Sequence, residues 1–76
     1  MNKERRKGLQ EIIDQLEELK SSIEEYQEEE EEYRDNIPEN LQGGERYEQA
    51  DEAVSSMEDA VSSLEDAISS IEEAIG

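Results

Sequence analysis

The side chains that could take part in chemistry are almost all carboxylates. The 76-residue chain has 24 Asp and Glu residues, seven Lys and Arg residues, three tyrosines, and neither histidine nor cysteine. Without His or Cys, no thiolate nucleophile, disulfide or ordinary zinc site is available. Serine pairs recur at 55–56, 62–63 and 69–70, but no base accompanies them that would activate a hydroxyl. The composition therefore predicts a protein that is not an enzyme and that uses no cofactor or metal.

The charge balance indicates the class of partner. The formal net charge is −17, and four of the seven basic residues lie within the first seven positions. The rest of the chain should present an acidic surface, which repels nucleic acid and anionic lipid and attracts basic proteins. No stretch is long and apolar enough to span a membrane or to act as a secretory signal. We therefore expect a cytoplasmic protein, inside a host cell, that binds a basic protein and neither nucleic acid nor a membrane.

The C-terminal third repeats every seven residues. Residues 53–73 read AVSSMED, AVSSLED and AISSIEE, and Ala74 starts the next repeat. Seven is the heptad period of packed helices, written abcdefg with apolar residues at a and d. The pattern predicts a helix over about 45–75 with alanines at g. Position a holds Tyr47, Val54, Val61, Ile68 and Ile75, and position d holds Ala50, Met57, Leu64 and Ile71.

The N-terminal half carries the same period and predicts a helix over about 5–35. Position a holds Leu9, Leu16, Ile23, Glu30 and Ile37, and position d holds Ile12, Leu19, Tyr26 and Tyr33. Pro38 and the pair Gly43–Gly44 place a connection at about 36–44, with a single turn at 38–41. We expect a basic N-terminal tail at 1–7 and one domain at 8–76.

A connection this short makes the helices antiparallel neighbours, so the predicted fold is an all-α helical hairpin. With a and d of both helices facing each other, Tyr33 would lie near Tyr47, and Lys20 would face Glu58 or Glu65. The basic tail would lie beside Glu72 and Glu73 at the other helix end.

A lone hairpin leaves part of each apolar stripe uncovered, and the alanines at g widen that stripe. We therefore expect a homodimer that forms a four-helix bundle. Its self-association core would contain Leu16, Leu19, Ile23, Met57, Val61, Leu64, Ile68 and Ile71. The alternative is a monomer that becomes ordered on its partner.

The run Glu28–Glu32 places a carboxylate, Glu30, at position a beside the hairpin tip. Arg34 follows at i+4, and Ala50 faces it across the hairpin, so the carboxylate should be paired or hydrated. Tyr26, Tyr33 and Tyr47 surround this end and offer hydroxyls to the acids. We expect looser packing at this tip, comprising Tyr26, Glu30, Tyr33 and Tyr47, and look here first for a partner.

The acidic surface is the remaining feature of the sequence that bears on function. Pairs of acids recur at e and f of the second helix, about 10 Å apart, and duplex DNA presents comparable charge along a rod. A rigid acidic rod can occupy the nucleic-acid groove of a basic protein. The alternatives are acids that only keep the protein soluble, and a structural or adaptor coiled coil that binds through its apolar and tyrosine face. The candidate partner-binding acids are Glu24, Glu25, Glu28, Glu31, Glu32, Asp35, Glu58, Asp59, Glu65 and Asp66.

The segment RRKGLQEIIDQLEELKSSIEEYQEEEEEYRDNIPENLQ, the link GGERYE and the ladder AVSSMEDAVSSLEDAISSIEEAI together span nearly the whole chain. This combination resembles short acidic proteins from phages and mobile elements of Gram-positive bacteria. Phage proteins that block host defence nucleases by imitating DNA, including some anti-CRISPR and anti-restriction proteins, are similar in charge and size. The resemblance implies a phage-related, cytoplasmic protein that interacts with the host, and it implies no catalytic residue.

Overall fold

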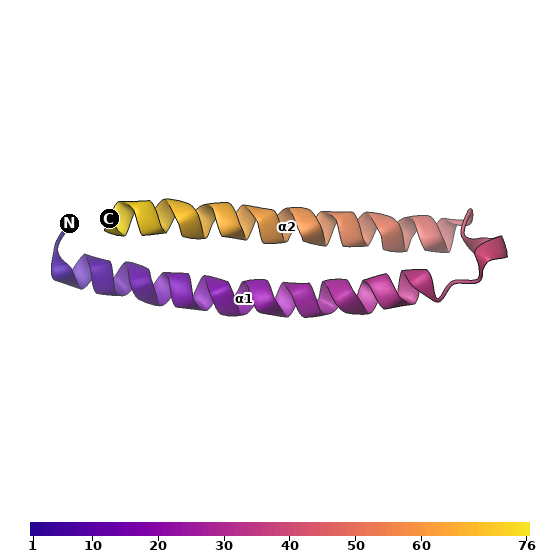
Figure 1. The fold of residues 1–76 in the computed structure, drawn as a ribbon, viewed down its shortest axis with the longest axis horizontal. Coiled ribbons are helices and arrows are strands. Elements are labelled where there is room, and N and C mark those ends of the chain that lie inside the picture. Colours follow the sequence, from indigo (N-terminus) through magenta and orange to yellow (C-terminus); the bar gives the residue numbers. More distant parts are fainter.

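The structure, a computed structural model, describes residues 1–76 as two long antiparallel helices (Figure 1). Helix α1 runs Lys3–Asp35, the short 3-10 helix η1 runs Glu39–Leu41, and α2 runs Glu45–Ile75. The rod has extents of 59 × 15 × 12 Å, with both termini at one end and the connection at the other. The predicted all-α helical hairpin is confirmed.

The helix ends follow from local sequence. Asn2 caps α1, because its side-chain oxygen accepts a 2.8 Å hydrogen bond from the backbone N–H of Arg5. The helix ends where Pro38 disfavours helical geometry at the residue before it. Gly44 precedes α2, and a Cβ there would come within 3.1 Å of the Leu41 carbonyl oxygen. Glycine at this position therefore allows the close return from η1 into α2.

The residues of α2 that face α1 are those that the heptad pattern predicts. Ala50, Val54 and Ile68 are buried, and the other a and d residues of α2 are half-buried. We call the line of contact between the two helices the seam. Positions a and d of α2 form its half of the seam.

Helix α1 faces α2 with a different pair of rows from the one that the sequence suggested. Its seam residues are at a and e, where Ile13 and Ile37 are buried and the others are half-buried: Leu9, Leu16, Lys20, Ile23, Gln27, Glu30 and Arg34. The d row of Ile12, Leu19, Tyr26 and Tyr33 is exposed. The expectation that this row packs in the seam against α2 is therefore wrong.

Charge accounts for this rotation of α1. Lys20 Nζ lies 3.8 Å from Glu65 Oε1, and Arg34 Nη1 lies 2.9 Å from Asp51 Oδ1. Lys20 therefore faces one of the two acids expected for it. Turning position e of α1 toward α2 lets both mid-helix cations reach the acids at e of α2. The large d residues of α1 are then turned away from α2.

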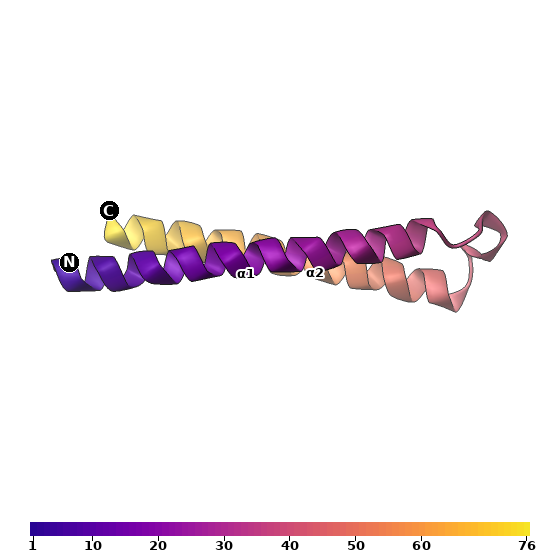
Figure 2. The ribbon, with the colours of Figure 1, turned by 90° about the horizontal axis from the view of Figure 1, so that it is seen from below.

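The hairpin by itself has a very small core. Only five residues are buried: Ile13, Ile37, Ala50, Val54 and Ile68. The helices cross at a shallow angle when the rod is seen from below (Figure 2), so each covers only a narrow strip of the other. Small chains with so little buried apolar surface are generally stabilised by disulfides, metals or association.

Candidate functional site

The cross-helix ion pairs identify the two long sides of the hairpin. Lys20, Arg34, Glu65 and Asp51 are all at position e, so the e rows of both helices lie on one side of the seam. At 100° per residue, d lies on the opposite side of a from e, and g lies beyond d. The d row of α1 and the g row of α2 must therefore share the other side of the seam.

That other side is apolar, and we call it the apolar face. Its exposed row is Ile12, Leu19, Tyr26 and Tyr33, with exposed fractions of 44%, 57%, 67% and 44%. The half-buried d residues of α2 lie beside the seam on this face, followed by the alanines at g: Met57, Leu64, Ile71, Ala53, Ala60, Ala67 and Ala74. Every expected self-association residue is either on this face or in the seam, with Ile68 alone fully buried inside the hairpin.

The side that carries the ion pairs is acidic, and we call it the acidic face. Around the circumference of α1, position b lies next to e on the side away from a. Glu24 and Glu31 at b therefore flank the seam here, across from Glu58 and Glu65 of α2. The remaining expected partner-binding acids continue around the outer surfaces of the two helices: Glu25, Glu28, Glu32, Asp35, Asp59 and Asp66. Those of α1 border one shallow hollow, together with Glu29 and Glu31.

Few of the acids have a basic partner. Four of the 24 acidic side chains, namely Glu17, Asp35, Asp51 and Glu65, lie within 4 Å of a basic group. No group of carboxylates is placed to hold a metal ion. Most of the acidic side chains are therefore unpaired, although Asp51 and Glu65 on the acidic face are paired with Arg34 and Lys20.

Lys20 and Arg34 each have two acidic partners, and those of Arg34 are the closer. The Arg34 guanidinium donates hydrogen bonds to Asp35 at 3.1 Å and to Asp51 at 2.9 Å. The hydrogen bond to Asp35 raises the pKa of Arg34, desolvation lowers it, and the hydrogen bond to Asp51 raises it again, with a net increase. Of the two states expected for Glu30, paired with Arg34 or hydrated, the pair is not formed. Glu30 stays half-buried in the seam row without an ion partner.

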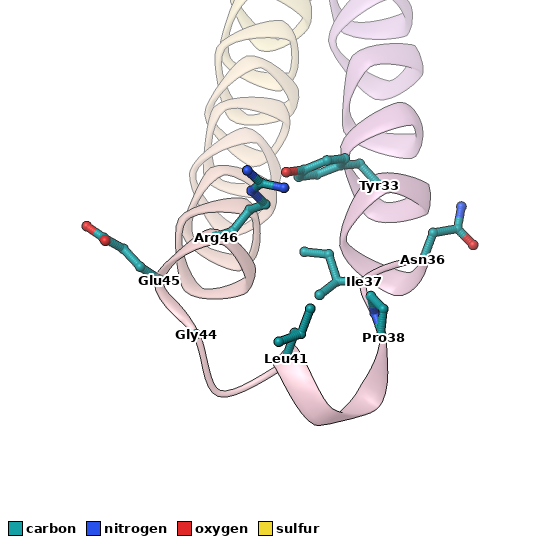
Figure 3. A pocket seen from close by; sticks show the side chains of 8 residues that line it. All are labelled: Tyr33, Asn36, Ile37, Pro38, Leu41, Gly44, Glu45 and Arg46. Carbon is teal, nitrogen blue, oxygen red and sulfur yellow. The ribbon is translucent and has the colours of Figure 1, made fainter.

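The hairpin tip contains a largely apolar pocket of about 440 Å³ (Figure 3). Tyr33, Ile37 and Leu41 line it, with Arg46 at the start of α2. The side chains of Tyr33 and Arg46 point toward each other across the pocket, and Arg46 makes no ion pair. Of the expected tip residues, only Tyr33 lines this pocket. Tyr26 lies farther along the apolar face, whereas Glu30 and Tyr47 lie in the seam.

The basic N-terminal residues are part of α1 instead of packing beside the end of α2. Lys20 is level with Glu65, so Ile75 is level with about Gln10, and the first turns of α1 extend beyond α2 (Figure 1). Lys3, Arg5, Arg6 and Lys7 accordingly make no ion pair. The expected contact with Glu72 and Glu73 is therefore wrong, because α1 is longer at this end.

The sequence also contains a row of seam residues that the apolar periodicity did not predict. Ile13, Lys20, Gln27 and Arg34 repeat every seven residues at position e, and all four lie in the seam. The spacing of Lys20 and Arg34, which matches that of Glu65 and Asp51, was the signal that would have revealed the rotation of α1.

No helix has the length and apolar character that crossing a membrane requires. Comparison of the chain with protein-family models, with curated proteins and with solved structures finds no match.

Proposed function

We propose that this protein is a non-enzymatic acidic inhibitor that occupies the nucleic-acid-binding surface of a basic host protein by imitating DNA. The observation that carries the proposal is the acidic face, where carboxylates of both helices line one side of a 59 Å rod, in a chain in which 20 of the 24 acidic side chains have no basic partner. The chemistry of such a face fits a cationic groove and offers no site for a small substrate.

The spacing of the charges supports this choice. Successive acids at position e of α2 are seven residues apart, or about 10 Å along the axis, and those of α1 interleave with them across the seam. Duplex DNA presents one charge per roughly 1.7 Å, so the hairpin imitates a sparser version of that field. We expect association to be fast and to weaken steeply with salt.

Amide substitution at the tip end of α1 tests the proposal. A variant with Glu24, Glu25, Glu28, Glu31 and Glu32 all changed to Gln should keep the helical hairpin and lose the partner. The partner would be captured with the unaltered protein from a Gram-positive lysate and identified, and then displaced with duplex DNA across a salt series.

The matched control removes five negative charges at the open end, by Gln or Asn substitution of Glu11, Asp14, Glu18, Glu72 and Glu73. It has the same net charge as the test variant. If both variants bind equally well at moderate salt, or if the captured protein does not bind DNA, mimicry is wrong.

A second candidate, an adaptor or structural coiled coil, is favoured by the apolar face. Leu19 and Tyr26 are more than half exposed in the middle of a helix that otherwise displays carboxylates. Contiguous apolar patches of this kind mark protein interaction sites. An adaptor would retain its partner after the five Glu→Gln changes and lose it when Leu19 is made polar.

Self-association fits the inhibitor, because it would cover the apolar face that an adaptor needs for its partner. We propose a homodimer in which the apolar faces of two hairpins meet and form a four-helix bundle. The rod is 59 Å long and 15 Å wide, so each copy has a face of roughly 900 Å², close to the ~800 Å² per partner of a standard stable interface.

A further inference from the structure

We infer that the second copy packs on the apolar face in the opposite direction, with its basic open end over the glutamate-rich tip of the first. This inference rests on the proposed homodimer and adds the direction, the register and the contacts of the pair. Two copies that pack face to face around a two-fold axis have two possible directions. Either the two tips lie over each other, or the tip of each copy lies over the open end of the other. The charge distribution along the rod distinguishes these two arrangements.

The two ends of the hairpin differ strongly in charge. Lys20 is level with Glu65, so residues 20–65 form the tip half; they contain 16 acidic and three basic side chains, whereas the open half contains eight and four. A tip-over-tip dimer would bring together the two halves of charge −13. A tip-over-open-end dimer places each of them on a half of charge −4. Repulsion between like charges is therefore weaker in the second arrangement.

The charged residues on the apolar face itself fit the same direction. Arg5 is at position d, in line with Ile12 and Leu19, and it makes no ion pair. Glu30 is at position a near the tip, half-buried and also without an ion partner. In the tip-over-open-end dimer, Arg5 of each copy can meet Glu30 of the other.

That pairing sets a register in which the apolar residues also match. Arg5 and Glu30 are 25 residues, or about 37 Å, apart on α1, so the two-fold axis passes between positions 17 and 18. Leu16 then meets Leu19 of the second copy, Ile12 meets Ile23, and Leu9 meets Tyr26. Because Glu65 of α2 is level with Lys20 of α1, Ala67 is level with the two-fold axis. The two α2 helices then approach each other through small side chains.

Gly8 gives independent support for this register. A glycine inside a helix is destabilising by roughly 0.5–1 kcal/mol relative to alanine. A Cβ at Gly8 would meet nothing within 4 Å, so nothing inside the hairpin requires its absence. Gly8 instead helps to form a shallow apolar groove with Arg5, Leu9 and Ile12. In the proposed register, this groove receives Tyr26 of the second copy, the most exposed large apolar residue of the chain.

A single label at the tip measures the direction. The chain has no cysteine, so Asn40→Cys provides one attachment point in the exposed connection. Light scattering first gives the mass, with a dimer at about twice 8.7 kDa. In that dimer, we expect electron spin labels about 60–70 Å apart and no pyrene excimer. A monomer would refute the dimer itself, whereas a dimer with labels within about 20 Å would refute only its direction.

Charge reversal tests the contact between Arg5 and Glu30. Arg5→Glu should raise the dimer dissociation constant roughly tenfold or more, because two such pairs are lost per dimer. Combining it with Glu30→Arg should restore the constant to within about threefold. Arg6→Glu is the matched control, since it makes the same charge change at position e, on the acidic side. Equal effects of Arg5→Glu and Arg6→Glu, or the absence of rescue, would overturn the contact.

Discussion

Replacing Leu19 with Gln tests whether the apolar face is covered in solution. Gln has similar length and helix propensity, so the hairpin should keep its helices. Leu19 is 57% exposed in the hairpin, and full burial of a leucine side chain is worth about 1.5–3 kcal/mol. Covering the exposed part therefore contributes roughly 0.9–1.7 kcal/mol per copy, or about 1.7–3.4 kcal/mol per dimer. The dimer dissociation constant should rise roughly 20- to 300-fold.

Sedimentation equilibrium over a wide concentration range measures this constant. Leu41→Gln is the matched control, because Leu41 is 56% exposed but lies in the connection, outside the apolar face. We expect the control to change the constant less than threefold. If Leu19→Gln leaves the mass distribution unchanged, or if the two variants weaken the dimer equally, the apolar face is not the interface.

Four further outcomes follow from particular contacts. Val54→Ala should lower the free energy of unfolding by about 1–2.5 kcal/mol in urea titrations, because Val54 is buried in the seam. Lys20→Met should change that energy by less than about 1 kcal/mol, because Glu65 is 55% exposed and ion pairs at the surface contribute little. Gly8→Leu should disrupt the dimer by filling the groove at the open end, whereas Gly8→Ala should raise helix stability. Raising NaCl from 0.01 to 1 M should raise the melting temperature, because salt screens the repulsion of a −17 chain. A fall would mean that the ion pairs outweigh that repulsion.

The arrangement of α2 could be read from its sequence, whereas the rotation of α1 could not be read from apolar periodicity alone. In α2 the apolar arc is bordered by acids at e and f, so only one pair of rows can face another helix. In α1 the arc is wider, because Ile12 at d and Ile13 at e lie on either side of Leu9 and Leu16. The a and d rows or the a and e rows could each form the seam. The choice depends on cross-helix charge pairs, which a count of apolar residues does not include.

The candidate surfaces follow from that rotation. The sequence identified the acids, the tyrosines and the aliphatic rows, but it placed the d row of α1 inside the hairpin. With Lys20 and Arg34 turned toward Glu65 and Asp51, the aliphatic and tyrosine row becomes an outer surface, and Glu30 remains in the seam without the arginine. The tip pocket was also missed, because Arg46 and Leu41 approach Tyr33 only through the fold of the connection.

The separation of the two faces makes the proposed functions compatible. If the apolar faces meet, each acidic face points outward, on opposite sides of a four-helix rod. The basic open ends, which would weaken a DNA-like field on a single hairpin, are then matched with glutamates of the other copy. Dimerisation would therefore make the acidic surface more uniform along the rod as well as stabilise the fold. A variant that dimerises poorly, such as Leu19→Gln, should accordingly bind a DNA-binding partner more weakly although every acid is retained. Equal partner binding by the monomeric variant would separate the two functions.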